Sequence, residues 1–165
     1  MKRVRFLFVI LFLIYGQAIL AQDHNHDDLV HTDHTHPKNE LGIANNLTYL
    51  GNEGELAYGL HLHFIRNIGE SPFGYGLGYE QIFDDHLHRN LSIIGSYTPV
   101  EHLFLTLSPG ITFIGREKPE KTFALHLEAT YEYELGAMHI GPVAGYSISG
   151  HGYHISLGLH LAYAF

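Results

Sequence analysis

Histidine is the residue type with the most chemical potential in this sequence, which contains 15 histidines and no cysteine. Imidazole and carboxylate groups together form a ligand set that suits Zn²⁺, Ni²⁺ or Cu²⁺. The first concentration lies in residues 22–39, QDHNHDDLVHTDHTHPKN, where five histidines are interleaved with four aspartates. Its two His-x-His pairs make this segment a candidate chelator, with the ligands His24, His26, His31, His34 and His36. The alternative is a solvated acidic linker that binds no metal.

A second set of candidate ligands is spread through the rest of the chain. His61 and His63 lie two residues apart, so they share one face if their segment is a β-strand. His126 and Glu128 have the same spacing, and we expect His160 at a similar depth on the closing strand. These five residues are our candidate for an interior Zn²⁺, Ni²⁺ or Cu²⁺ site. The alternative is a plug of His, Glu, Ser, Thr and Tyr side chains that hydrogen-bond to one another.

The elements that must hold these side chains are β-strands. In the last segment, the odd-numbered residues from Ile155 to Phe165 are apolar or aromatic, and the even-numbered residues from His154 to Ala164 are small or polar. The same period of two recurs from Glu40 onward. It predicts eight strands, at 40–50, 54–66, 72–83, 89–99, 101–115, 121–134, 137–147 and 152–165. Short connectors predict antiparallel hairpins, and one of them carries a third His/Asp group: Asp84, Asp85, His86 and His88.

The two faces of these strands differ in a way that predicts which one lies outside. The face with the inward histidines otherwise carries Gly, Ala, Ser and Thr, which suits the narrow lumen of an eight-stranded barrel. The other face has Leu and Ile in the middle and Tyr and Phe near the strand ends, as in the aromatic girdles of membrane barrels. We therefore predict an all-β fold, an eight-stranded antiparallel up-and-down transmembrane β-barrel. A soluble periplasmic barrel with its apolar face inside is the alternative.

The N-terminus predicts export from the cytoplasm. Three basic residues precede the apolar run Phe6–Tyr15, and small residues follow up to Ala21, as in a cleaved secretory signal peptide. We expect a signal peptide at 1–21, a disordered His/Asp-rich periplasmic segment at 22–39 and the barrel at 40–165. Loss of residues 1–21 would remove three of the nine Lys and Arg and none of the 17 Asp and Glu, leaving a net charge of −11. Such an acidic protein is not expected to bind nucleic acid.

The C-terminal residues resemble a known family. Leu161-Ala162-Tyr163-Ala164-Phe165 looks like the terminal strand of bacterial outer-membrane proteins, and residues 40–165 resemble the small barrels of the OmpA/OmpX type. The Leu-Ala-Gln junction resembles that of Bacteroidota proteins. The resemblance implies a monomer in the outer membrane of a Gram-negative cell, with lipid and the barrel assembly machinery as partners and both termini in the periplasm. The predicted outer loops are shorter than those of adhesive members.

An enzyme is the other function that the sequence raises. Some small outer-membrane barrels are lipid A deacylases or acyltransferases, and His154-x-Ser156 superficially resembles the deacylase His-x-Ser pair. Leu157 follows here instead of the Asn of that family, and both residues are expected to face inward. We therefore expect a non-enzymatic barrel that handles divalent metal, with a lipid-modifying enzyme and a purely structural barrel as alternatives.

Overall fold

The computed structural model describes residues 37–165, which form antiparallel strands joined by short turns. The expected signal peptide and all five histidines of the segment 22–39 lie outside the described residues. The strands are β1 (Asn39–Leu50), β2 (Glu55–Asn67), β3 (Phe73–Phe83), β4 (His88–Val100), β5 (Leu103–Ile114), β6 (Glu120–Tyr131), β7 (Tyr133–Leu135), β8 (Met138–Ser149) and β9 (Gly152–Ala164). With β6 and β7 taken together, the strand ends lie within two residues of the predicted segments, because the period-two pattern and the turn residues mark the same boundaries.

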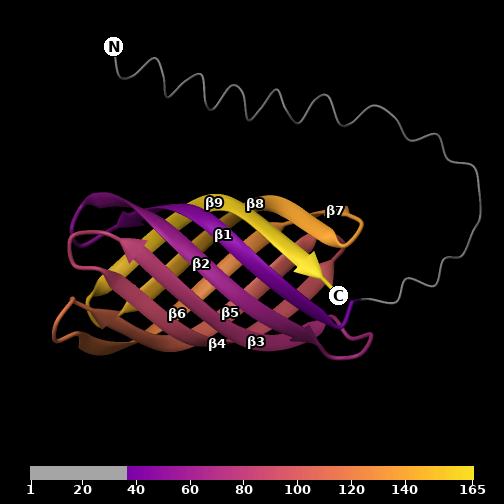
Figure 1. Cartoon of the computed structure of the whole chain (residues 1–165), viewed down its shortest axis with the longest axis horizontal. Helices are drawn as coiled ribbons and strands as arrows, with labels where there is room; N and C mark the ends of the chain where they lie inside the picture. The colour runs from indigo at the N-terminus through magenta and orange to yellow at the C-terminus, as the bar shows by residue number, and fades with distance from the viewer. Residues whose placement is uncertain (1–36) are drawn as a thin grey trace, which may run out of the picture. The chain divides into compact units, whose positions relative to one another are not determined.

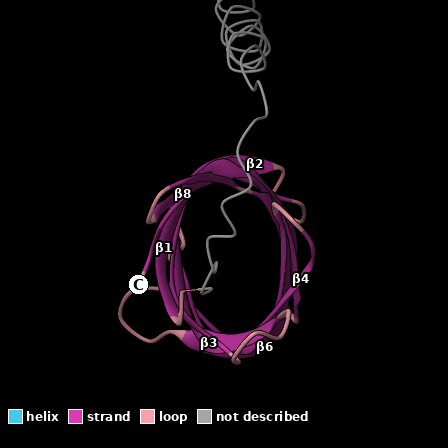
Figure 2. Ribbon diagram, turned by 90° about the vertical axis from the view of Figure 1, so that its right-hand side faces the viewer, coloured by secondary structure: helices cyan, strands magenta, loops and turns pink. Residues whose placement is uncertain are grey.

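The sheet closes on itself into a barrel. Consecutive strands pair, except that β6 and β7 both pair with β8, and β1 also pairs with β9, so that the strands form a ring (Figure 2). Nine labelled strands make an eight-stranded barrel, since β6 and β7 are two parts of one strand that pairs with β8. The predicted fold is therefore confirmed. Both ends of the described chain lie at one end of the barrel, where the Asn39 amide donates to the Phe165 carbonyl at 2.8 Å (Figure 1).

We call this end, which holds residues 37 and 165 and the turns 68–72, 101–102 and 136–137, the terminal end. The opposite end, which holds the turns 51–54, 84–87, 115–119 and 150–151, is the turn end. Every turn has five residues or fewer, so nothing in the described chain projects far from the barrel. The short loops predicted from the sequence are confirmed.

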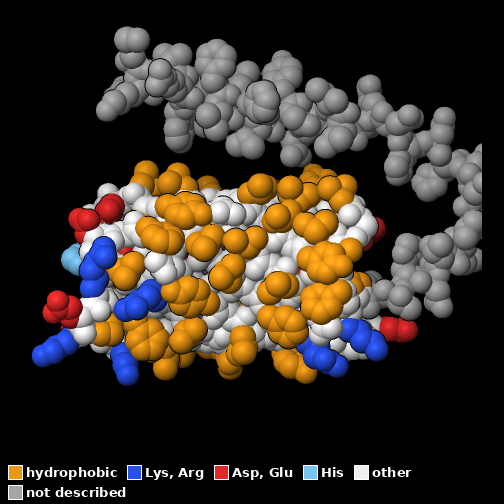
Figure 3. Space-filling view, in the orientation of Figure 1, with side chains coloured by type: hydrophobic (Ala, Val, Ile, Leu, Met, Phe, Trp, Pro, Cys, Tyr) orange, Lys and Arg blue, Asp and Glu red, His pale blue; other side chains and the backbone are white. Residues whose placement is uncertain are grey.

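The outer surface of the barrel is apolar. Leu77 is 64% exposed and Ile93 is 63% exposed, and apolar side chains cover the middle of the barrel while Lys and Arg lie toward its two ends (Figure 3). Aromatic side chains stack near each end, as Phe73 does with Tyr97 at the terminal end and Tyr58 with Phe83 at the turn end. This belt with two girdles is the surface of a membrane barrel. No helix within residues 37–165 is long and apolar enough to span a membrane.

The interruption between β6 and β7 has a local cause. The register pairs Thr130 with Val143 and Tyr133 with Ile140, which sets Pro142 opposite Tyr131. Proline has no N–H to donate to the neighbouring strand, so the ladder of hydrogen bonds breaks there. Gly141 permits the close approach that results, since a Cβ on it would overlap with the Tyr131 carbonyl. Glu132 lies in this gap, where its backbone amide donates to the carbonyl of His102 at 2.7 Å.

Candidate metal centre

The most convergent group of metal-ligating side chains lies in the lumen around β1. Gly42 on β1 pairs with His63 on β2, and Ala44 pairs with His160 on β9, so the two imidazoles flank β1 from opposite sides. Both rings need the small residues of β1, because a Cβ on Gly42 would overlap with the His63 ring and lie 2.7 Å from His160 Nε2. Glu40, two residues before Gly42, faces the same side of the strand and is buried.

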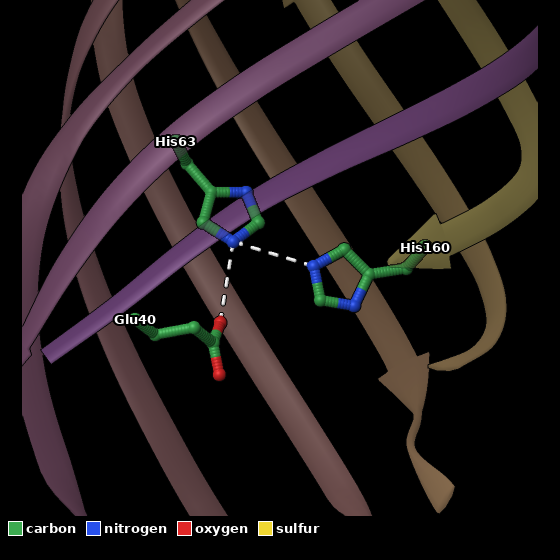
Figure 4. A group of neighbouring side chains, drawn as sticks. All are labelled: Glu40, His63 and His160. Carbon is green, nitrogen blue, oxygen red and sulfur yellow. Dashed lines mark hydrogen bonds and ion pairs between the residues drawn. The ribbon is translucent and has the colours of Figure 1, made fainter. Parts of the chain in front are cut away.

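The three side chains bring their ligand atoms to a common point. His63 Nε2 lies 3.3 Å from Glu40 Oε1 and 3.3 Å from His160 Nε2 (Figure 4). Glu40, His63 and His160 are 6%, 7% and 2% exposed. Ligands about 2.0–2.1 Å from a tetrahedral Zn²⁺ lie about 3.3–3.4 Å from one another. The two separations at His63 therefore match two edges of a tetrahedral site, and all three ligand atoms lie within 4.8 Å of one another.

Two further residues extend this group toward the terminal end. His139 Nδ1 lies 3.2 Å from Glu40 Oε2 and 3.3 Å from Glu132 Oε2. The other oxygen of Glu132 lies 3.2 Å from His160 Nδ1. We call the five residues Glu40, His63, Glu132, His139 and His160 the terminal cluster. Carboxylates that face the second nitrogen of a ligating histidine are a regular feature of metal sites, because they fix the orientation of the ring.

The other histidines of the lumen form a second group, nearer the turn end. His61 Nδ1 lies 3.1 Å and 3.0 Å from the two carboxylate oxygens of Glu128. Glu80 Oε2 lies 3.4 Å from His126 Nδ1, and Glu80 Oε1 lies 3.6 Å from His154 Nε2. We call these five residues the turn-side cluster. The carboxylates of both clusters thus face imidazoles, as expected for a lumen whose inward positions carry neither Lys nor Arg.

The structure therefore divides the predicted interior site among several groups. His63 and His160 meet, His61 faces Glu128, and His126 faces Glu80. Glu132, His139 and His154 also face inward, although they are not among the metal ligands predicted from the sequence. Glu40 was missed altogether. The parity of β1 could have found it, since Glu40, Gly42 and Ala44 alternate with the outward residues Leu41 and Ile43.

The third predicted group lies in the turn 84–87 and is largely a turn motif. Asp84 Oδ1 accepts from the His88 amide at 3.0 Å, and Oδ2 accepts from the His86 amide at 3.1 Å and lies 2.8 Å from His88 Nδ1. Burial raises the pKa of the Asp84 carboxyl, but these donors and the His88 charge outweigh it, so the pKa is lowered. Asp84 and His88 also lie near Glu53. Because three donors already occupy the Asp84 carboxylate, little of it remains for a metal.

Cavities lie at the two ends of the lumen. A cavity of about 430 Å³ at the terminal end is lined by Glu40, Glu132 and His139 of the terminal cluster, and by Pro37 and His102 among others. A cavity of about 30 Å³ at the turn end is lined by Glu80 and His154, among others. His63 and His160 line neither cavity. The terminal cluster thus has an inner part, shielded within the barrel, and an outer part beside a cavity.

A closed eight-stranded antiparallel barrel with an apolar outer face and a polar lumen is a transmembrane β-barrel of the outer-membrane type. Neisserial surface protein A is similar in fold, with 9% sequence identity, a TM-score of 0.57, and coverage of 77% of this chain and 96% of that one.

Ail, the attachment invasion locus protein of Yersinia pestis, solved in complex with the heparin analogue sucrose octasulfate, is also similar. It has 14% identity, a TM-score of 0.52, and coverage of 79% and 99%. A de novo designed transmembrane β-barrel matches at 11% identity and a TM-score of 0.54, over 78% of this chain and 97% of the design. No family model and no curated protein matches the sequence. The resemblance to small outer-membrane barrels is thereby confirmed, and the Bacteroidota origin stays a prediction.

Proposed function

We propose that this protein is a non-enzymatic outer-membrane barrel that binds a divalent transition metal, of the class of Zn²⁺, Ni²⁺ or Cu²⁺, in its lumen. The ligands are Glu40, His63 and His160. The observation that carries the proposal is the convergence of His63 Nε2, His160 Nε2 and Glu40 Oε1, with separations of 3.3 Å along both contacts of His63. Two imidazoles and one carboxylate form a donor set found in zinc sites, which leaves a fourth position open.

The charge balance of the lumen supports a bound cation. Glu40 and Glu132 lie close together, and both are at least nine-tenths buried. Burying a carboxylate is costly unless a cation or several donors compensate it. A divalent ion on neutral histidines would supply that charge directly. The competing arrangement is a plug in which protonated histidines supply it, and in which His63 and His160 share an N–H···N hydrogen bond.

The His-rich segment 22–36 is the second part of the proposal. It directly precedes Pro37, which lines the terminal-end cavity together with Glu40. Its histidines (His24, His26, His31, His34 and His36) would capture metal loosely and raise its concentration beside the lumenal site. In this proposal both termini lie in the periplasm, the barrel is a monomer in outer-membrane lipid, and the barrel assembly machinery inserts it.

A lipid-modifying enzyme has less support. His154 and Ser156 lie on the lumenal side of β9. His154 Nε2 lies 3.6 Å from Glu80 Oε1. A deacylase needs its nucleophile and base within reach of the lipid at the outer rim. We therefore do not propose this activity for the His154-x-Ser156 pair.

The test is a calorimetric titration of the full chain, purified in detergent, with Zn²⁺, Ni²⁺ and Cu²⁺. The comparison uses a tail variant in which His24, His26, His31, His34 and His36 are replaced by Gln. We expect binding that survives in the tail variant and weakens at least about 100-fold when His63→Gln is added, because removal of outer-shell partners alone costs about 10–100-fold. His86→Gln, in an exposed turn, is the matched control and should change nothing.

The other outcomes would each reject part of the proposal. Binding that disappears in the tail variant would make the segment 22–36 the only chelator and the barrel its anchor. An absence of binding in both chains would leave a structural barrel whose histidines fill the lumen. An equal loss in His63→Gln and His86→Gln would show that the effect does not arise at the lumenal site.

A further inference from the structure

The two oxygens of Glu40 face two different groups of ligands. Oε1 lies 3.3 Å from His63 Nε2, on the side of His160, whereas Oε2 lies 3.2 Å from His139 Nδ1. His139 Nδ1 in turn lies 3.3 Å from Glu132 Oε2. Glu40, Glu132 and His139 can therefore offer one ligand atom each to a second common point, separate from that of His63 and His160. Glu40 belongs to both sets.

The terminal cluster contains buried atoms that have charged neighbours but no hydrogen bond. His139 Nδ1 is within 3.3 Å of two carboxylates, yet it has no hydrogen bond, and the same holds for His160 Nδ1 and Glu132 Oε1, which lie 3.2 Å apart. His139, Glu132 and His160 are 9%, 7% and 2% exposed. Other buried polar atoms are unpaired as well, His126 Nε2 of the turn-side cluster among them, but these three atoms belong to ionisable groups of one cluster. Of the three, His139 Nδ1 lies between the Glu40 and Glu132 oxygens, and a cation at this point would bind all three atoms at once.

We propose that the terminal cluster is a dinuclear metal centre in which the Glu40 carboxylate bridges two divalent ions. This rests on the proposed function above. The inner ion is held by His63 Nε2, His160 Nε2 and Glu40 Oε1. The outer ion is held by His139 Nδ1, Glu132 Oε2 and Glu40 Oε2. Paired ions in protein sites lie about 3.5–4 Å apart, a separation that a single carboxylate can span.

The two positions differ in access and in charge. Glu40, Glu132 and His139 line the cavity of about 430 Å³, whereas His63 and His160 do not, so only the outer ion can exchange readily with the terminal end. Two carboxylates balance one divalent ion, and the two charges of the second ion need small anions such as hydroxide from the cavity. The inner ion should therefore bind first and more tightly, and the outer ion should bind more weakly.

The experiment is electron paramagnetic resonance of the tail variant loaded stepwise with Cu²⁺. Below one equivalent we expect the spectrum of an isolated Cu²⁺ ion. Above one equivalent we expect that signal to lose intensity and a half-field transition to appear, because two ions joined by one carboxylate are magnetically coupled. Adding His139→Gln, or Glu132→Gln if the first variant does not fold, should remove the coupled signal, lower the bound copper by one ion per chain and leave the isolated spectrum. Glu134→Gln removes a carboxylate from the same cavity outside the cluster and should keep the coupling.

The outcomes separate this inference from the proposed function. Isolated spectra at every loading, with the same bound copper in His139→Gln, would overturn the dinuclear centre and leave a single metal site. A tail variant that retains no copper would overturn both. Coupling that persists in both His139→Gln and Glu132→Gln would show that the outer ion is held elsewhere, which also overturns the assignment.

Discussion

The two clusters of the lumen have the same composition and different geometry. In the turn-side cluster, His61 lies about equally close to both oxygens of Glu128, at 3.1 Å and 3.0 Å, which makes a self-contained pair. In the terminal cluster, each carboxylate faces two imidazoles, and each of its oxygens faces a different one. The pair of His61 and Glu128 consumes its own polar atoms. Glu80 also faces two imidazoles with separate oxygens, but at 3.4 Å and 3.6 Å, whereas the two carboxylates of the terminal cluster are linked through His139 at 3.2 Å and 3.3 Å. Residue types alone thus do not distinguish a structural plug from a metal site, but the way in which the oxygens are shared does.

The largest effect on stability is expected in the turn-side cluster. Glu128→Gln would leave His61 buried without its charge partner, and loss of one member of a buried pair costs about 3–5 kcal/mol of unfolding free energy. Replacing both residues by Leu should cost much less, because no unpaired charge remains. Glu132→Gln should also cost less, because its partners His139 and His160 keep contacts with Glu40 and His63. Urea unfolding in lipid vesicles measures all three, and equal losses for Glu128→Gln and Glu132→Gln would remove the distinction between the clusters.

For metal affinity we expect the larger effect in the terminal cluster and the smaller one in the turn-side cluster. His160→Gln removes a ligand of the proposed centre and should weaken Zn²⁺ binding by the tail variant at least about 100-fold, because loss of a residue that only supports a ligand already costs about 10–100-fold. Ala44 pairs with His61 on one side and with His160 on the other. His61→Gln therefore changes the same residue type at the same level of the barrel and should leave the affinity for Zn²⁺ within about threefold of the parent. Calorimetry on the two variants measures the contrast. A stronger loss in His61→Gln would place the metal in the turn-side cluster instead.

Two glycines allow a test that changes no ligand. A Cβ on Gly42 would meet the far end of the flexible His63 side chain and lie 2.7 Å from His160 Nε2. The rings can move aside, so Gly42→Ala should fold but weaken Zn²⁺ binding about 10–100-fold, in the range of a disturbed metal shell. Gly78→Ala is the control in the other cluster, where the Cβ would lie 2.8 Å from Ser92 Oγ and 3.0 Å from His61 Nε2. If both variants bind Zn²⁺ as the parent does, the imidazoles do not need their observed positions.

The sequence was sufficient to predict the strands and their faces, but not which side chains meet across the lumen. Alternation alone places His63 and His160 inward, whereas their contact depends on register. Ala44 pairs with both His61 and His160, yet His160 reaches His63, because Gly42 leaves space at that level. The place of Glu132 depends on the Gly141–Pro142 break opposite β6, which interrupts the strand without shifting the register. Such details arise from packing between distant segments, which a local period does not encode.

The smallest effect concerns the turn 84–87, where the acidic group is a turn motif and not a lumenal cluster. The pKa of Asp84 is lowered from its ordinary value of 3.8, so the ionised carboxylate stabilises the folded state above about pH 4, and this contribution is lost as the pH falls through the lowered pKa. Asp84→Asn should therefore cost about 1 kcal/mol at pH 7 and progressively less in more acidic buffer, where the parent also loses the charge. Asp85→Asn, at the exposed neighbouring position, is the control and should change the free energy of unfolding little at pH 7. Unfolding curves at pH 7 and pH 3 measure the difference between parent and variant. A constant difference would mean that the His86 and His88 amides hold an amide oxygen as well as a carboxylate, so that Asp84 acts in the turn through its shape and not its charge.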